Sequence, residues 1–161
     1  MATRTPAAKP APAHDPQALQ RLDRQLCFAL YSSSLLMTKL YKPVLAPLGL
    51  TYPQYLVLLV LWERGDASVT GIGNALQLET GTLSPLLKRL ETAGFITRTR
   101  QAEDERSVVV GLTDAGRALE ERAATVQREV SDATGMTDDE IVALRATLRR
   151  LAGNLRATAS R

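Results

Sequence analysis

The chain has 161 residues, with 20 Lys and Arg against 17 Asp and Glu, a formal net charge of +3 and a hydrophobic content of 45%. These values are typical of one globular domain with tails and exclude a largely disordered chain. The single cysteine excludes an internal disulfide, and the single histidine argues against a histidine-based metal site or a Ser-His-Asp triad. We therefore expect neither a metal nor another cofactor.

The longest apolar run covers only residues 56–62, whereas a membrane helix needs ~20 apolar residues. Residues 1–16 (MATRTPAAKPAPAHDP) have no apolar stretch of the kind found in secretory signals, so we expect a cytoplasmic protein. Nine of these sixteen residues are Ala or Pro, which predicts a disordered tail. The folded domain is expected over residues 17–161.

Helical spacing of apolar residues runs from Gln17 to about Val44, where Pro43 and Pro47, followed by Gly49, should bend or end the helix. A second apolar helix is predicted over residues 52–64, with Pro53 in its first turn and Gly65 just after its end.

Two short helices are predicted next, over residues 69–76 and 80–93, joined by a turn at 77–79. Residues 95–100 and 107–112 are rich in β-branched residues and flank a charged loop, which predicts a two-stranded hairpin. A helix-turn-helix followed by such a hairpin is a winged helix. The expected fold is therefore mainly α-helical, with a winged helix-turn-helix over residues 52–112.

The remaining segments, 17–50 and 113–157, are predicted to form long amphipathic helices. Thr113 is typical of a helix N-cap, and Thr137 with Glu140 forms a capping-box pattern at the start of the last helix. Apolar stripes at both chain ends favour a helical dimer interface, which would place two recognition helices about one DNA turn apart, on an inverted repeat. The alternative is a four-helix core within a monomer.

The second helix of the helix-turn-helix begins with small hydroxyl residues and carries cations farther along, a combination suited to base edges and phosphates. The arginines of the hairpin suit a narrow minor groove, and a carboxylate beside them suits the orientation of an arginine by a bidentate pair. The alternatives without a role in DNA binding are that Thr80 and Thr82 serve only as helix caps and that the hairpin loop is a solvated charged turn. The predicted DNA-binding residues are Thr80, Thr82, Ser84, Lys88, Arg89, Arg98, Asp104 and Arg106.

Cys27 lies in the first predicted helix, four residues before Tyr31 and therefore on the same face. A lone cysteine is most often an inert small apolar residue of the core. Against this, Tyr41, Tyr52 and Tyr55 lie near the helix ends that a dimer would bring together. A thiolate accepts hydrogen bonds from phenols and is the form that peroxides oxidise.

These residues lie in segments that resemble the MarR family of winged-helix repressors, and within it the branch that senses organic hydroperoxides. The resemblance runs from about Leu22 to Leu155. It is carried by the segments LCFALYSSS, YKPVLAPLGLTYPQYLVLLVLWE, LETGTLSPLLKRLE, GFITR and EDERSVVVGLTDAG.

The resemblance implies a homodimeric repressor whose reactive thiol is Cys27, hydrogen-bonded by Tyr41 and Tyr52 of the partner subunit, with Tyr31 nearby. Organic hydroperoxides would oxidise the thiolate to a sulfenic acid, and the repressor would then release the operator of a hydroperoxide-reducing enzyme. In two-cysteine members a resolving cysteine precedes an Ala-Thr-Gly; here Ser131 or Asp132 occupies that place. A one-cysteine mechanism follows, in which a small external thiol reacts with the sulfenic acid.

Two other functions remain open at this stage. One is an ordinary MarR-type repressor released by a non-covalently bound phenolic or aromatic ligand, with a structural cysteine. The other is a thiol peroxidase with Cys27 as the nucleophile. The sequence contains no resolving cysteine for repeated turnover, so we expect a regulator rather than an enzyme.

Overall fold

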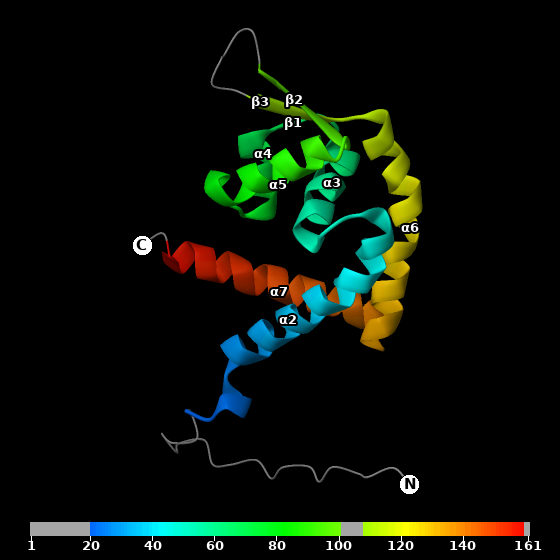
Figure 1. Cartoon of the computed structure of the whole chain (residues 1–161). Coiled ribbons are helices and arrows are strands. Elements are labelled where there is room, and N and C mark those ends of the chain that lie inside the picture. The colour runs from blue at the N-terminus through cyan, green and yellow to red at the C-terminus, as the bar shows by residue number, and fades with distance from the viewer. Residues whose placement is uncertain (1–19, 101–107, 160–161) are drawn as a thin grey trace. The chain divides into compact units, whose positions relative to one another are not determined.

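Helices make up most of the chain in the computed structural model, which describes residues 20–100 and 108–159 (Figure 1). The chain divides into two units, Met1–Leu40 and Tyr41–Arg161, and the whole winged helix belongs to the second. The elements in chain order are the 3-10 helix η1 (Leu22–Arg24), α2 (Leu26–Leu45), the 3-10 helix η2 (Ala46–Leu48), α3 (Tyr52–Arg64), β1 (Ala67–Ser68), α4 (Val69–Leu76), α5 (Thr80–Thr92), β2 (Ile96–Arg100), β3 (Val108–Leu112), α6 (Asp114–Thr134) and α7 (Asp138–Ala159).

The single helix predicted from Gln17 to about Val44 is wrong at residues 20–25, because α2 begins only at Leu26. The Arg21 guanidinium binds the Asp23 carboxylate, with Nε and Oδ1 3.1 Å apart. This pair joins Asp23 to the residue that precedes η1, because Arg21 is its N-cap and has an extended backbone. Gln25 is then extended and separates the two helices. The predicted tail, residues 1–16, lies outside the described residues.

Helix α3 has the predicted bounds, and its N-terminus shows why. The Gln54 side chain accepts a hydrogen bond of 2.8 Å from the Thr51 backbone N–H, the reciprocal half of a capping box. Pro53 lies in the first turn, where no intrahelical N–H bond is lost. At the other end Gly65 has a φ of +75°, which is costly for any residue with a Cβ.

The predicted helix-turn-helix is confirmed: α4 and α5 contact each other, and both contact α3. The Ser68 hydroxyl caps α4 by accepting a hydrogen bond of 3.0 Å from the Gly71 N–H. At the turn, a Cβ on Gly73 would lie 2.9 Å from the Leu78 carbonyl oxygen. A larger residue would therefore force the turn open, so Gly73 permits the close approach of α4 to α5.

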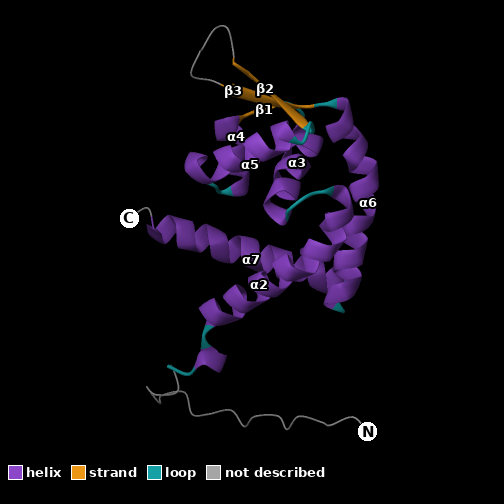
Figure 2. Cartoon of the chain, in the orientation of Figure 1, coloured by secondary structure: helices purple, strands orange, loops and turns teal. Residues whose placement is uncertain are grey.

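The wing is a three-stranded antiparallel sheet in the order β1-β3-β2, drawn in orange in Figure 2. Strands β2 and β3 are the predicted hairpin, with Ile96 opposite Leu112 and Arg100 opposite Val108. The short strand β1 was not predicted, because two residues between helices show no alternation. The core lies beneath this sheet and is formed by residues of α3, α4, α5 and both long strands: Val57, Leu58, Leu61, Ile72, Leu83, Leu87, Leu90, Ile96 and Val110.

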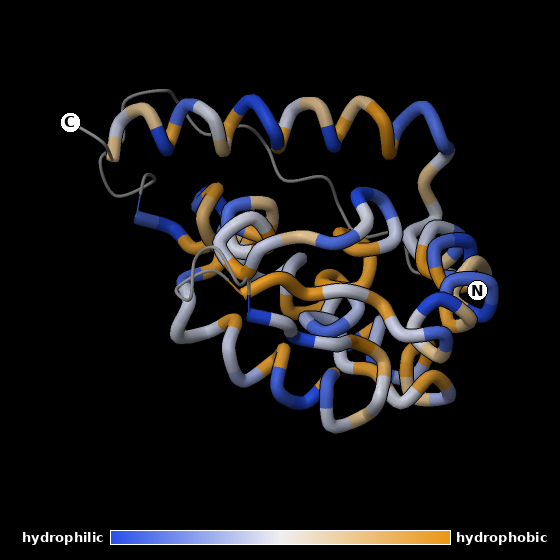
Figure 3. Tube along the Cα trace, turned by 90° about the horizontal axis from the view of Figure 1, so that it is seen from above, coloured by the Kyte–Doolittle hydropathy of each residue, from blue (hydrophilic) through white to orange (hydrophobic). Residues whose placement is uncertain are grey.

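Helices α6 and α7 begin as the capping patterns predict. Thr113 Oγ1 accepts a hydrogen bond of 3.0 Å from the Gly116 N–H. Glu140 accepts one of 2.8 Å from the Thr137 N–H, a bond that lowers the pKa of the Glu140 carboxyl. Helix α6 buries Leu119, Ala123, Val126 and Val130, whereas α7 buries no residue. Hydrophobic and hydrophilic segments alternate along α7, the helix that ends at C in Figure 3.

Within residues 20–100 and 108–159, no single helix has both the length and the apolar character needed to cross a membrane. One pair of consecutive helical segments, Leu26–Leu48 and Tyr52–Arg64, reaches that length and apolarity only when the two are taken together.

Candidate functional site

One face of α5 is apolar and buried, and the other is exposed and polar. Leu83, Leu87 and Leu90 are fully buried beneath the helix. Thr80, Thr82, Lys88 and Arg89 are exposed, as a groove-reading face requires. The half-buried Ser84 donates its hydroxyl hydrogen bond to the Thr80 carbonyl, 2.8 Å away.

The alternative in which Thr80 and Thr82 serve only as helix caps is wrong. The N-cap of α5 is Glu79, and no side chain caps this helix end. Both threonine hydroxyls therefore lie on the exposed part of the first turn, at the end of α5 that carries the positive pole of the helix dipole. A helix N-terminus of this kind attracts phosphate and carries short hydroxyls toward base edges.

The wing contributes Arg98 from β2, whose side chain lies toward α5. Its NH1 is 3.7 Å from the Glu91 carboxylate, and 30% of the Arg98 side chain is exposed. Its Nε–H is buried and finds no hydrogen-bond partner among the described residues. Arg98 is thus held loosely beside α5. The other two predicted wing residues, Asp104 and Arg106, lie outside the described residues.

Cys27, the only cysteine of the sequence, is exposed in the first turn of α2. Tyr31, one helical turn later, is 63% exposed. The interpretation of Cys27 as an inert residue of the core is therefore wrong for the single chain, since neither Cys27 nor Tyr31 is part of the apolar core. An exposed thiol is accessible to small oxidants, whereas a buried one is protected from them.

The second unit contains a cluster of three phenols, contributed by α2 and α3. The ring centroids of Tyr41 and Tyr52 are 4.4 Å apart, and those of Tyr41 and Tyr55 are 6.0 Å apart. Burial, together with the neighbouring phenols Tyr52 and Tyr55, raises the pKa of Tyr41 to about 12. Burial also raises the pKa of Tyr52 and of Tyr55. All three hydroxyls therefore remain protonated hydrogen-bond donors at neutral pH.

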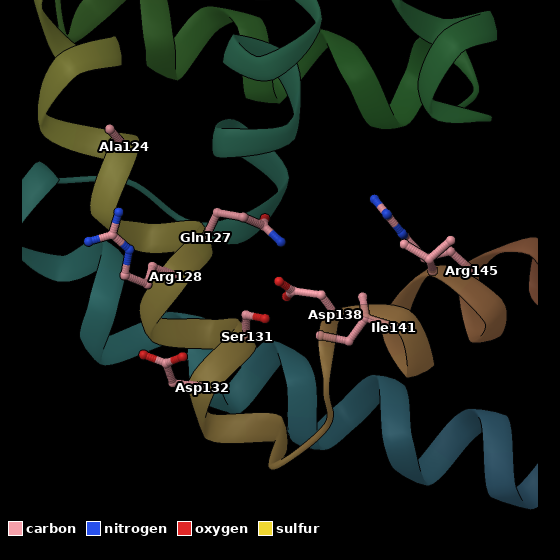
Figure 4. A pocket seen from close by; sticks show the side chains of 9 residues that line it. Ala124, Gln127, Arg128, Ser131, Asp132, Asp138, Ile141 and Arg145 are labelled. Atoms are coloured by element: carbon pink, nitrogen blue, oxygen red, sulfur yellow. The ribbon is translucent and has the colours of Figure 1, made fainter.

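Two open grooves lie along α6 in the second unit. The first, of about 540 Å³, runs between α6 and α7 and is lined by both cationic and anionic side chains, among them Arg128, Asp138 and Arg145 (Figure 4). The second, of about 710 Å³, adds α3 and combines the aromatic rings of Tyr55 and Trp62 with Arg145 and Arg149. Glu63 and Glu120 also line this second groove, so its aromatic rings suit a planar ligand while its charged groups are of both signs.

Sequence reasoning did not select Glu91, Trp62 or Gly116, which the structure connects to the predicted site residues. Glu91 pairs with Arg98 across a turn, and Trp62 donates a hydrogen bond to Gly116, 54 residues later. Neither pair has a spacing that helical or strand periodicity would reveal. The only signal in the sequence was that Trp62 is its sole tryptophan.

Comparison with known proteins gives consistent results. The sequence model of the family described as transcriptional regulator SarA/Rot matches residues 39–122. The organic hydroperoxide resistance transcriptional regulator of Bacillus subtilis is 46% identical over 131 residues, which cover 81% of this chain and 89% of that protein. The HTH-type transcriptional regulator TtmR of Methylorubrum extorquens is 48% identical over 145 residues, 90% of this chain and 73% of that protein.

Among solved structures, this chain is similar to reduced AbfR bound to DNA, with a TM-score of 0.71 and 38% identity. The match covers 86% of this chain and 96% of that one. AbfR is a protein of Staphylococcus epidermidis, and it has also been solved in an overoxidised DNA-bound form and in a disulfide form.

Proposed function

Because the chain belongs to the MarR family of winged-helix transcriptional regulators, in the branch of the organic hydroperoxide resistance regulators, we propose that it is a repressor that senses organic hydroperoxides through Cys27. The observation that carries this proposal is that the only thiol lies outside the apolar core of the single chain, which is 46% identical to such a regulator. The protein acts in the cytoplasm, where small thiols keep Cys27 reduced and its DNA target is present.

The proposed chemistry has two steps. The Cys27 thiolate attacks the outer oxygen of the hydroperoxide; the O–O bond breaks, the S–O bond forms, and the alkoxide leaves as an alcohol after taking up a proton. The resulting sulfenic acid then reacts with a small external thiol to give a mixed disulfide and water. Since the chain has no second cysteine, the external thiol takes the place of a resolving cysteine.

The phenols supply hydrogen-bond donors to the thiolate in this proposal. Tyr41 and Tyr52 of the partner subunit donate to Cys27, with Tyr31 beside it. Support comes from the neighbouring positions of Tyr41 and Tyr52, whose ring centroids are 4.4 Å apart, so that two protonated phenols lie together. A sulfenic acid is larger and uncharged, and it replaces the acceptor that the phenols bind.

A homodimer accounts for the exposed apolar side chains of the terminal helices. In the first unit, Leu26, Leu35 and Leu36 of α2 are 59%, 53% and 66% exposed. In the second unit, Val142, Leu144, Leu148 and Leu155 of α7 are also exposed. Apolar side chains in such numbers favour burial by a second copy. Sedimentation should give a dimer, and Leu148→Glu should shift it toward monomer with loss of operator binding.

The proposed DNA contacts follow from the exposed face of α5 and from the wing. Thr80, Thr82, Ser84 and Lys88 read the major groove, Arg89 binds phosphates, and Arg98 belongs to the wing arginines that suit the minor groove. At the tip of the wing, Asp104 orients Arg106 into the minor groove. Two recognition helices of a dimer then read an inverted repeat.

The test combines intact mass with operator binding. The operator is first selected from random duplexes by the reduced protein. One equivalent of cumene hydroperoxide is then added with a small thiol present. We expect a single adduct on Cys27 whose yield follows the loss of DNA binding, and Cys27→Ser should bind the operator but retain it after the same treatment. Release of DNA by Cys27→Ser would contradict the sensing role.

A second candidate function is release by a non-covalently bound aromatic acid. The groove that contains Tyr55 and Trp62 favours it, because its aromatic rings suit a planar ligand. Arg145 and Arg149 would bind the acidic group, at the part of the groove away from the carboxylates of Glu63 and Glu120. Operator release by a phenolic acid that persists in Cys27→Ser and is lost in Arg149→Ala would select this function over the redox sensor.

A further inference from the structure

Four aromatic side chains form a continuous row through the second unit. Tyr52 contacts Tyr41, Tyr41 contacts Tyr55, and Tyr55 meets Trp62 edge-on, with ring centroids 6.1 Å apart and planes at 65°. Edge-to-face and tilted pairs at these distances attract each other beyond their apolar burial. In a closely packed row, displacement of one ring displaces the next.

Trp62 ends the row and connects it to another part of the fold. Its Nε1–H donates a hydrogen bond of 3.0 Å to the Gly116 carbonyl, in the first turn of α6. This is a single directional contact between α3 and α6, and it is partly buried. Loss of the Trp62 N–H would leave the partly buried Gly116 carbonyl without this hydrogen bond, which is energetically costly.

Gly116 lies at the root of the wing, where α6 leaves β3. A Cβ at this position would overlap the Phe95 carbonyl oxygen, so the backbones of α6 and of the segment before β2 are in direct contact. Thr113 strengthens the contact: its N–H donates to the Phe95 carbonyl at 3.1 Å, and its hydroxyl donates to the Gly94 carbonyl at 2.6 Å. The carbonyl that Trp62 binds therefore belongs to the turn that holds the wing.

We propose that Trp62 is a positioning residue of the redox response: through its hydrogen bond to Gly116 it transmits a change in the Tyr41–Tyr52–Tyr55 cluster to the root of the wing. This inference rests on the proposed function, because the change that it transmits is the loss of phenol contacts when Cys27 is oxidised. Trp62 is remote from the DNA-binding residues in sequence; it contacts Tyr55 on one side and donates to Gly116 on the other.

The test is Trp62→Phe, which keeps an aromatic ring and removes the N–H donor. We expect the reduced variant to bind the operator like the wild type and Cys27 to be oxidised to the same adduct. The ratio of operator affinities between reduced and oxidised protein should fall by roughly fivefold or more. Arg122→Gln is the matched control: it removes another long-range bond of α6, from Arg122 NH2 to the Pro47 carbonyl at 3.2 Å, and should keep the wild-type ratio.

The failures of the two proposals are distinguishable. If wild-type Cys27 forms no adduct, or if the adduct leaves the operator bound, the proposed function fails. If the wild type responds and Trp62→Phe responds equally, only the role of Trp62 is overturned.

A second measurement needs no variant. Trp62 is the only tryptophan, so its fluorescence reports on its own hydrogen bond. We expect the emission to shift in proportion to Cys27 oxidation and operator release. Unchanged emission during full release would also overturn the role of Trp62.

Discussion

The phenol rings of Tyr41 and Tyr52 lie 4.4 Å apart, centroid to centroid, although they belong to different helices. Tyr41 is almost fully buried in the last part of α2, and Tyr52 is the first residue of α3. The turn between the two helices, with Pro47 in η2 and Gly49 in the left-handed conformation, returns the chain so that both rings meet. The two phenols assigned to the thiol by family resemblance are therefore neighbours in the second unit.

The burial of Tyr41 predicts a loss of stability at alkaline pH. The pKa of the Tyr41 phenol is raised from about 10 to about 12 in the folded chain. Its contribution to the free energy of unfolding is therefore fully present below pH 10 and is lost as the pH rises through 12. Between these values the free energy of unfolding should fall by on the order of 2 kcal/mol more in the wild type than in Tyr41→Phe. Urea unfolding at each pH, with parallel absorbance titration of the phenols, measures it. If the free energy of unfolding fell equally with pH in the wild type and in Tyr41→Phe, the raised pKa of Tyr41 would be contradicted.

Replacement of Gly116 by Ala should destabilise the fold, because the new methyl group would overlap the Phe95 carbonyl. Overpacking of this kind costs about 1–3 kcal/mol, measurable by urea unfolding. Gly81→Ala is the control, since no atom lies within 4 Å of its Cβ position in α5. It should gain up to about 1 kcal/mol from helix propensity. A Gly116→Ala protein as stable as the wild type would show that the wing root has spare room.

Lys88 should contribute to operator affinity without contributing to stability, because its side chain is exposed on α5. Lys88→Ala is expected to weaken operator binding about tenfold and, if the contact is to phosphate, to lower the salt slope by about one. Arg128→Ala on α6 removes the same charge and should leave both values nearly unchanged. If both variants lost the same operator affinity, the effect of Lys88→Ala would be explained by the change in net charge and not by a contact with DNA.

The pair formed by Glu91 and Arg98 predicts a gain of function. Glu91→Gln removes the carboxylate that lies 3.7 Å from the Arg98 guanidinium, so Arg98 becomes available to DNA. Operator affinity should rise about threefold, in keeping with the small energies of exposed ion pairs. In the Arg98→Gln background the same change should have no effect. If Glu91→Gln still raised operator affinity in the Arg98→Gln background, the gain would come from the change in overall charge and not from release of Arg98 from Glu91.

Local sequence signals predicted much of the fold. The bounds of α3 follow from Pro53 in its first turn and from Gly65 after its end, and Thr113 and Thr137 mark the starts of α6 and α7. Such signals act over three or four residues and therefore operate in any context. The same reasoning failed at residues 20–25, where apolar spacing suggested a continuous helix but a short 3-10 turn lies between the extended residues Arg21 and Gln25.

The sequence by itself determined the winged helix, the hydroxyl and cationic residues of α5, and a single thiol one helical turn from a tyrosine. Only the tertiary structure decided that Arg98 faces Glu91, that three phenols form one cluster, and that Trp62 reaches Gly116. These relationships join residues from different elements, up to 54 positions apart. Their partners are set by how amphipathic helices and strands bury a common core, which no local periodicity specifies.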